Sequence, residues 1–430
     1  MNNLSTLFNG NDLISDEIGL LHQMIKIPTM NLDPLLLGFG VWPSNTEPLL
    51  GVKYNIRGSG CSPSWEESIL GTIGEIVERY APLFYDIKKG KKTTFKNIDI
   101  LAVHPKEFAL FHNKQFEDDG FKLKKFDEDI ELTWFSMYDL TNGKETWVPG
   151  QFIYMPFRGD ENYITVNTST GLAAHTNYYK AILTGLYEVI ERDSFVITWM
   201  QNLVPQKIKL SREIQSYISN LFPCQYEWHF FDIRYDIEVP TVFGICFGEA
   251  EYGKFVAVSS ATRATYGEAL KKAIQEIGQA VPYFRHLLGE KKGWRPSNDF
   301  GSIQNFEDHS IFYTLRPDLW HVFDKWRDAK ETKEIDFSET AKRPDVKEIR
   351  HIVTLLKDKK YNVLFKDVTT PDIRQLGFYS VKVFVPQLIP LSGGYSFYFS
   401  GGERLYSVPK KMGFESNHFE NLNTYPHPFP

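Results

Sequence analysis

Two segments of the chain repeat one arrangement of apolar and acidic positions, and both predict an amphipathic helix. Residues 69–79 read ILGTIGEIVER and residues 182–192 read ILTGLYEVIER. Because residues three and four apart share a helix face, the apolar side chains of each segment form one stripe. The stripes consist of Ile69, Leu70, Ile73, Ile76, Val77 and Tyr80, and of Ile182, Leu183, Leu186, Val189 and Ile190. Such stripes face a core, which leaves the acidic residues on the opposite side.

The face opposite each stripe carries the pattern Glu-x-x-Glu-Arg. Its members are Glu75, Glu78 and Arg79 in the first helix and Glu188, Glu191 and Arg192 in the second. A single pair of this kind is usually a solvated helix face. Two features favour a ligand here. Like charges at this spacing repel, which a divalent cation would relieve, and Gly71 and Gly74 would let a ligand approach the backbone, at a cost of about 1 kcal/mol each relative to alanine.

A third helical segment, residues 268–279, extends this pattern. Lys272, Glu276 and Gln279 lie at positions i, i+4 and i+7 and therefore share a face. If the three helices converge, five carboxylates meet the basic groups of Arg79, Arg192 and Lys272. Carboxylates for a hard cation and basic groups for phosphate are what a magnesium nucleotide site needs. The sequence contains no Gly-x4-Gly-Lys-Ser/Thr loop, so the site would be of another kind.

Strand-like runs surround these helices and predict an α+β fold. Residues 133–155 predict a hairpin around Thr141-Asn142-Gly143. Further strands are expected at residues 163–168, 226–232, 241–248, 255–259 and 379–385. Residues 168–174 would join a strand to the second carboxylate helix, where free N–H groups favour phosphate. Ser62-Pro63 is expected to begin the first carboxylate helix.

The remaining segments differ from this pattern. Residues 1–50 are mixed and contain a short helix expected at residues 17–25, so we interpret them as an N-terminal arm that precedes a domain of residues 51–430. Residues 286–350 are rich in charge and predict surface helices and loops. The tail, residues 425–430, has proline at every second position, which holds it extended and removes amide donors. Most termini fray, but a stiff tail loses less entropy on ordering, so both outcomes remain open.

Composition limits the possible classes of function. The net charge is −6 and no basic stripe with interleaved aromatics occurs, which argues against a nucleic-acid partner. Three cysteines without zinc-type spacing indicate neither a disulfide framework nor a structural metal, and so favour a reducing compartment. The sequence has no run of 18 apolar residues and no signal-peptide pattern. We therefore expect a cytoplasmic protein without a membrane partner.

Taken together, these motifs resemble the YcaO family of ATP-dependent enzymes that modify peptide backbones. The resemblance covers roughly residues 50–430. It is carried by Gly74-Glu75-x-x-Glu78-Arg79, by Gly171-Leu172-Ala173-Ala174 leading to Glu188-x-x-Glu191-Arg192-Asp193, by Ala269-x3-Ala273-x2-Glu276-x2-Gln279, and by Pro426-x-Pro428-x-Pro430. It implies a YcaO-type fold with mixed or antiparallel sheets, whose helices converge on a site for ATP and Mg2+.

The resemblance also implies roles for single residues. Glu75, Glu78, Glu188, Glu191 and Glu276 would coordinate Mg2+, while Arg79, Arg192, Lys272, Gln279, Thr176 and Lys180 would lie around the nucleotide. Some positions depart from the family pattern: Ser59 replaces a basic residue, Lys180 a glutamate, and Thr170 and Thr176 asparagines. Lys180 cannot ligate a metal, so we expect it to contact phosphate instead.

A tail of this kind resembles that of azoline-forming cyclodehydratases, which would make Pro426, Pro428 and Pro430 catalytic. In that chemistry a Cys, Ser or Thr side chain attacks the preceding carbonyl, ATP phosphorylates the resulting oxygen, and loss of phosphate gives a thiazoline or oxazoline. The implied partners are a precursor peptide, a separate ThiF-like leader-binding protein, a flavin-dependent azoline dehydrogenase where the product is oxidised, and a second copy in a homodimer. Two alternatives remain: thioamide or amidine formation, and a degenerate scaffold subunit, which Ser59 and Lys180 would favour.

Overall fold

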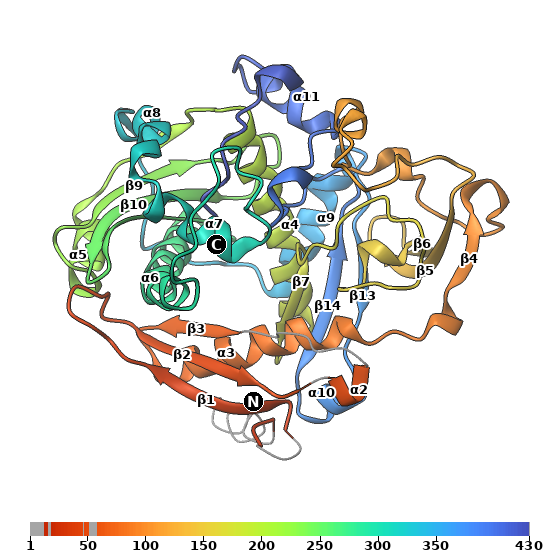
Figure 1. The fold of residues 1–430 in the computed structure, drawn as a ribbon, viewed down its shortest axis with the longest axis horizontal. Helices are drawn as coiled ribbons and strands as arrows, with labels where there is room; N and C mark the ends of the chain where they lie inside the picture. Colours follow the sequence, from red (N-terminus) through yellow and green to blue (C-terminus); the bar gives the residue numbers. More distant parts are fainter. Residues whose placement is uncertain (1–12, 16–18, 46, 51–57, 430) are drawn as a thin grey trace.

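The structure is a computed structural model that describes residues 13–15, 19–45, 47–50 and 58–429 (Figure 1). The helices are α2 (Glu47–Leu50), α3 (Trp65–Tyr80), α4 (Tyr178–Met200), α5 (Arg212–Leu221), α6 (Tyr266–Glu290), α7 (Phe306–Leu315), α8 (Asp324–Arg327), α9 (Asp345–Asp358), α10 (Pro371–Gln375) and α11 (Glu403–Lys411). The strands are β1 (Leu21–Ile27), β2 (Leu37–Pro43), β3 (Ser59–Ser62), β4 (Lys91–Thr94), β5 (Glu131–Asp139), β6 (Lys144–Pro149), β7 (Leu172–His175), β8 (Gln206–Ile208), β9 (Glu227–Asp232), β10 (Thr241–Ala250), β11 (Gly253–Thr262), β12 (Glu331–Lys333), β13 (Leu364–Asp367) and β14 (Tyr379–Phe384).

Within the described residues the strands form three sheets. Their orders are β1-β2-β3, β11-β10-β9-β8-β12, and β4-β5-β13-β14-β7, with β6 paired to β5. The pairings between these strands are antiparallel except for that of β8 with β12, which is parallel. The predicted α+β fold with mixed and antiparallel sheets is therefore confirmed. The hairpin is also confirmed, as β5 and β6, and so are the later strands expected near β9, β10, β11 and β14.

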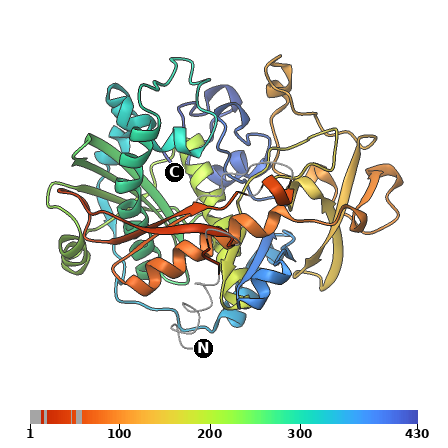
Figure 2. The ribbon, with the colours of Figure 1, turned by 60° about the horizontal axis from the view of Figure 1, so that its bottom comes forward.

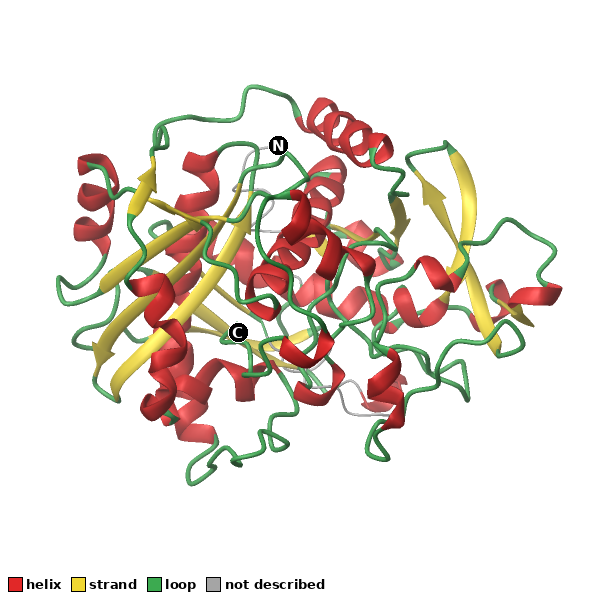
Figure 3. Ribbon diagram, turned by 90° about the horizontal axis from the view of Figure 1, so that it is seen from above, coloured by secondary structure: helices red, strands yellow, loops and turns green. Residues whose placement is uncertain are grey.

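Helix α4 runs through the middle of the molecule and joins its parts (Figure 1). It packs against β7 and β14 of one sheet, β11 of another, and the helices α9 and α11. Most of its residues are buried, including Phe195 and Ile197, which are fully buried. Figure 3 shows the five-stranded sheet and the β5–β6 hairpin toward opposite ends of the molecule, with the C-terminus between them. A residue on α4 can therefore face several elements at once.

The three-stranded sheet and helix α3 pack together below α4 in Figure 1, and they come to the front in the turned view of Figure 2. The close approach of β3 to α3 requires a glycine, because a Cβ at Gly60 would lie 2.2 Å from the Ser68 carbonyl oxygen. Helix α6 packs on β10 and β11 and also contacts β3. Since α3 contacts β7 while α4 follows β7 directly, this packing brings α3, α4 and α6 around one region.

Several sequence predictions about the N-terminal half are wrong. Residues 21–25, expected in a short helix, belong to strand β1, while residues 17 and 18 lie outside the described residues. The sheet of β1, β2 and β3 contains strands from both sides of residue 50, and the domain division expected there stays a prediction. The first carboxylate helix begins at Trp65 and is capped by Ser64 rather than Ser62. Pairing with β2 overrides the helical periodicity of so short a segment.

Two predictions about later segments are also wrong. Residues 163–168 form a loop, because side chains bind their backbone: Gln151 Oε1 accepts from the Ile164 N–H at 3.0 Å, and Lys382 Nζ donates to the Thr168 oxygen at 3.0 Å. The strand in this region is β7, within the expected linker. Helix α7 is largely buried, although residues 286–350 were expected on the surface, since Ile311, Phe312 and Tyr313 join the core. No helix in the described part of the chain is both long and apolar enough to cross a membrane.

Candidate functional site

The glutamates of the two repeated motifs face each other across α3 and α4. Glu188 lies close enough to Glu78 to raise its pKa, and Glu276 of α6 similarly raises the pKa values of Glu188 and Glu191. The side chain of Glu191 is 9% exposed and that of Glu78 is 19% exposed. Glu75 and Glu276 are more exposed, at 34% and 30%. The structure therefore brings together the carboxylates that the sequence predicted would converge, in a site that ranges from buried to partly exposed.

The turn before α4 fixes the direction of this helix. Gly171 has a φ of +84°, and a Cβ there would lie 2.1 Å from the Val383 carbonyl oxygen. The Val383 N–H in turn donates to the Gly171 oxygen at 2.7 Å, which ties the entrance of β7 to β14. Asn177 then caps α4 by accepting from the Lys180 N–H at 3.1 Å. The Gly171 turn before β7 and the Asn177 cap after it thus fix where α4 begins, and so where its glutamates lie.

Ser59 joins the first and third helices of the site. Its N–H donates to Glu75 Oε2 at 2.7 Å, and its hydroxyl accepts from Gln279 Nε2 at 2.9 Å. Strand β3 therefore bridges α3 and α6. A methyl group at Gly74 would meet one protein atom, the Ala174 oxygen, at 3.9 Å. Because protein packing does not demand this glycine, close approach of a ligand remains its best explanation.

The two arginines of the site make long ion pairs with its glutamates. Arg79 lies 3.6 Å from Glu78, and Arg192 lies 3.8 Å from Glu188, both longer than a good charge-assisted hydrogen bond. Lys272 makes a closer pair with Glu276 at 3.1 Å. The buried Nη1 of Arg192 has no hydrogen-bond partner in the described part of the chain. An unsatisfied buried guanidinium nitrogen is a ready donor for an anion such as phosphate.

Burial perturbs the acidity of the glutamates. It raises the pKa values of Glu75 and Glu188, and it raises those of Glu78 and Glu191 to about 8, because neighbouring arginines only partly offset the loss of water. Among the described residues no three His, Cys, Asp or Glu side chains already form a metal-binding group. The glutamates nevertheless fit Mg2+, which keeps water and phosphate ligands and needs few carboxylates.

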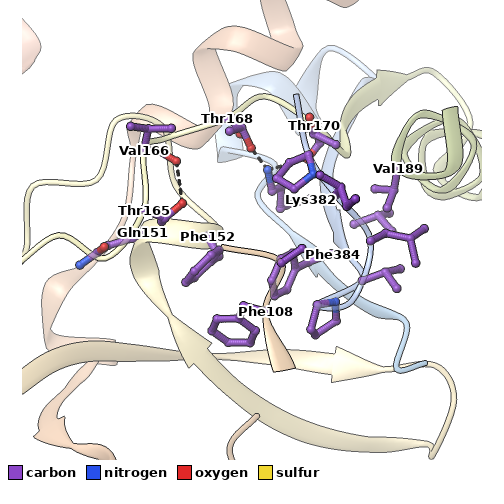
Figure 4. A pocket seen from close by; sticks show the side chains of 17 residues that line it. Phe108, Gln151, Phe152, Thr165, Val166, Thr168, Thr170, Val189, Lys382 and Phe384 are labelled. Carbon is purple, nitrogen blue, oxygen red and sulfur yellow. Dashed lines mark hydrogen bonds between the residues drawn. The ribbon is translucent and has the colours of Figure 1, made fainter. Parts of the chain in front are cut away.

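Lys382 of β14 also belongs to the site, although the sequence analysis missed it. Its ammonium donates to the Thr168 and Thr170 oxygens at 3.0 and 2.7 Å, inside a pocket lined by Phe108, Phe152 and Phe384 (Figure 4). Burial lowers its pKa to about 8, against the opposing effects of Glu188 and Glu78. The available signal was a lysine within the valine-rich run SVKVFV, because lysine is seldom fully buried without a partner.

Two predicted residues near the start of α4, Thr176 and Lys180, lie at least two helical turns before Glu188. The Thr176 hydroxyl is 3.4 Å from His175 Nδ1, and the side chain of Lys180 is exposed. Lys180 makes no ion pair with any residue that the structure describes. Eight residues, about 12 Å of helix axis, separate it from Glu188. Its contact with phosphate therefore remains a prediction.

Residues 425–429 of the C-terminal tail lie in the middle of the molecule (Figure 1). Phe429 is 3% exposed, and the Arg192 guanidinium carbon lies 4.0 Å from the centre of its ring. The frayed terminus is therefore excluded for residues 425–429, and Pro426 and Pro428 are both in the interior. Pro430, to which a catalytic role was assigned, lies outside the described residues.

Comparison with solved structures identifies several with this fold. A heterocyclase in complex with substrate and cofactor has a TM-score of 0.81 at 20% identity, over 100% of this chain and 57% of that chain. YcaO from Methanopyrus kandleri, bound with AMPPCP and Mg2+, has a TM-score of 0.59 at 15% identity, over 86% of both chains. The E. coli microcin synthetase McbBCD complex with pro-MccB17 bound gives 0.60 at 15% identity, over 95% and 96%. These similarities establish the fold.

Comparison of the sequence itself is more specific. An uncharacterized protein encoded in a tfuA 3′ region of Rhizobium leguminosarum bv. trifolii is 31% identical over 81 residues, which cover only 19% of each chain. The chain also spans little more than half the length of the heterocyclase above. The family model described as YcaO cyclodehydratase, ATP- and Mg2+-binding, matches residues 59–389, well over half of the chain. On this match the chain belongs to the YcaO family.

Proposed function

We propose that this chain catalyses ATP-dependent cyclodehydration of Cys, Ser or Thr residues in a ribosomally made precursor peptide. The observation that supports it most is the partly buried set of glutamates on α3, α4 and α6, with Arg192 carrying an unsatisfied nitrogen among them. Such a set fits a magnesium nucleotide, which is what the family binds.

The residues have separate roles in this proposal. Mg2+ would be held by Glu75, Glu78, Glu188, Glu191 and Glu276. The bound ion supplies positive charge that offsets the triphosphate. Arg79, Arg192 and Lys272 would bind phosphate oxygens, and the structure adds Lys382, whose ammonium lies between the glutamates and the Thr170 loop. Gln279 positions Ser59, while Thr176 and Lys180 would meet the nucleotide from the start of α4.

The chemistry begins at the peptide. A thiol or hydroxyl loses its proton and attacks the preceding carbonyl carbon, and the amide oxygen takes up the negative charge. That oxygen attacks the γ-phosphorus of ATP, and ADP leaves. Loss of the amide proton then expels phosphate and forms the C=N bond of the azoline. Phosphorylation is needed because an amide oxygen is otherwise a very poor leaving group.

The tail would act on the nucleophile. Pro426 and Pro428 hold the chain extended beside Arg192, and Pro430 would complete this catalytic segment next to the attacking group. The proposed partners are the precursor peptide, a separate ThiF-like leader-binding protein, a second copy of the chain, and a flavin-dependent dehydrogenase where azolines are oxidised. The microcin synthetase with bound pro-MccB17 is a complex of this general kind.

Mass spectrometry of the precursor peptide tests this function. With ATP, Mg2+ and the partner protein, each azoline removes one water from the peptide mass, whereas thioamide formation would exchange oxygen for sulfur. A chain truncated after Thr424 should lose this activity but retain binding of the magnesium nucleotide, weakened by loss of the Phe429 ring from Arg192. Full processing by the truncated chain would refute the role of the tail. Failure of the intact chain to bind ATP with Mg2+ would instead favour the scaffold alternative.

A further inference from the structure

The carbonyl group of Thr424 and the first three carbonyl groups of the tail each accept a hydrogen bond from a different side chain. Tyr395 donates to the Thr424 oxygen at 2.7 Å, and Trp199 Nε1 donates to the Tyr425 oxygen at 3.0 Å. Tyr313 donates to the Pro426 oxygen at 2.8 Å, and His309 Nδ1 lies 2.8 Å from the His427 oxygen. Because the two prolines at 426 and 428 have no N–H, a groove that binds this segment needs mainly donors, and this one supplies them.

The four donors lie outside the tail, and two of them, Trp199 and Tyr313, are held in place by contacts that do not involve it. Trp199 stacks on Trp326 with ring centres 5.4 Å apart. Trp320 Nε1 donates to the Tyr313 carbonyl oxygen at 2.8 Å, which fixes that turn of α7. The groove is therefore built by α4, α7 and the segment that carries Tyr395, and a pocket lies along it.

Two side chains of the tail fill specific places in the groove. The His427 ring stacks on His309 with 3.7 Å between ring centres, and its Nε2 lies 2.8 Å from the Ser392 oxygen. Both rings are neutral, because burial lowers their pKa values, that of His427 to about 4. Phe429 lies between Arg192 and Phe195, whose ring centre is 4.9 Å away.

We propose that this groove is a peptide-binding site for proline-alternating segments with an aromatic residue at the position of Phe429, and that it binds the tail as a ligand that can be supplied in trans. Recognition depends on the backbone carbonyls and on the side chains of His427 and Phe429. The consequence for catalysis rests on the proposed function, but the binding itself does not.

The test uses the chain truncated after Thr424 and the synthetic peptide Tyr-Pro-His-Pro-Phe-Pro. Isothermal titration calorimetry should show saturable one-to-one binding, and the same peptide with Phe replaced by Ala should bind at least tenfold more weakly. Tyr313→Phe in the truncated chain removes one donor and keeps the ring, so it should weaken binding roughly three- to tenfold. Tyr179→Phe is the matched control, because Tyr179 is 51% exposed near the start of α4.

No binding by a folded truncated chain, or equal binding by the Tyr313→Phe and Tyr179→Phe variants, would overturn the proposal. If the truncated chain does not fold, hydrogen exchange in the intact chain replaces it. Tyr313→Phe should then speed exchange of the tail amides, and unchanged exchange would overturn the proposal. Added peptide should also restore water losses to the truncated chain. Binding without such restoration would count against the function proposed for the tail and leave the groove established.

Discussion

Replacing Arg404 by methionine should destabilise the protein strongly. Arg404 of α11 is 4% exposed, and its guanidinium donates to both oxygens of Asp193, to both oxygens of Asp236 and to the Tyr361 hydroxyl, at 2.7 to 3.1 Å. Asp193 is 1% exposed and follows Arg192 directly. Methionine preserves most of the side-chain volume but leaves Asp193 without its cation and Asp236 with only Lys359, at 4.0 Å.

The expected cost follows from that burial. Removing one partner of a buried ion pair costs about 3–5 kcal/mol, because the remaining charge is not compensated. Asp193 keeps one other hydrogen bond, from the Ile389 N–H at 3.0 Å, which does not neutralise it. Since Arg404 serves two carboxylates, we expect the upper part of this range. That is a large fraction of the roughly 5–15 kcal/mol by which a native protein is stable.

Urea unfolding of the intact chain measures this effect, with tryptophan fluorescence and circular dichroism as independent probes of one transition. Arg404→Lys is the matched control: it keeps the charge but not the planar fork, so it should cost less. Adding Asp193→Asn to Arg404→Met should recover part of the loss, because a buried amide is less costly than an unpaired carboxylate. A loss below about 1 kcal/mol for Arg404→Met would refute this reasoning.

Three further predictions concern the nucleotide site. Glu78→Gln and Glu191→Gln should each abolish most ATP hydrolysis while circular dichroism stays unchanged, and near-normal turnover in both would make these side chains an ordinary helix face. The pKa values of Glu78 and Glu191 are raised to about 8, and Mg2+ needs the ionised carboxylates. Affinity for the magnesium nucleotide should therefore rise from pH 6 to 8, by up to about tenfold per pH unit for each group, and level off above pH 8. Calorimetry that finds no pH dependence contradicts this. Lys180→Ala should raise the KM for ATP, whereas an unchanged KM would identify Lys180 as a surface side chain.

The sequence was most informative where a short repeat coincides with one helix face. Spacing alone placed Glu75 and Glu78 opposite the apolar stripe of α3, and the same holds for α4. Such reasoning failed for Lys382, because its partners are backbone oxygens of a loop more than two hundred residues earlier in the chain. It also failed for α7, whose short apolar turn lies between charged segments and is buried by contacts with distant parts of the chain.

Helix α4 carries three sets of functional contacts in succession, and this limits which sequence changes the helix can accept. Glu188 and Glu191 face the nucleotide region, Asp193 holds Arg404, and Trp199 binds the tail. One residue inserted between Glu191 and Asp193 would rotate everything beyond it by about 100° and advance it by about 1.5 Å. A point substitution would therefore disturb one of these contacts at a time. A single insertion there would move both Asp193 and Trp199 out of their positions relative to the carboxylates. The number of residues in this part of α4 is therefore expected to be fixed, even where the residues themselves can vary.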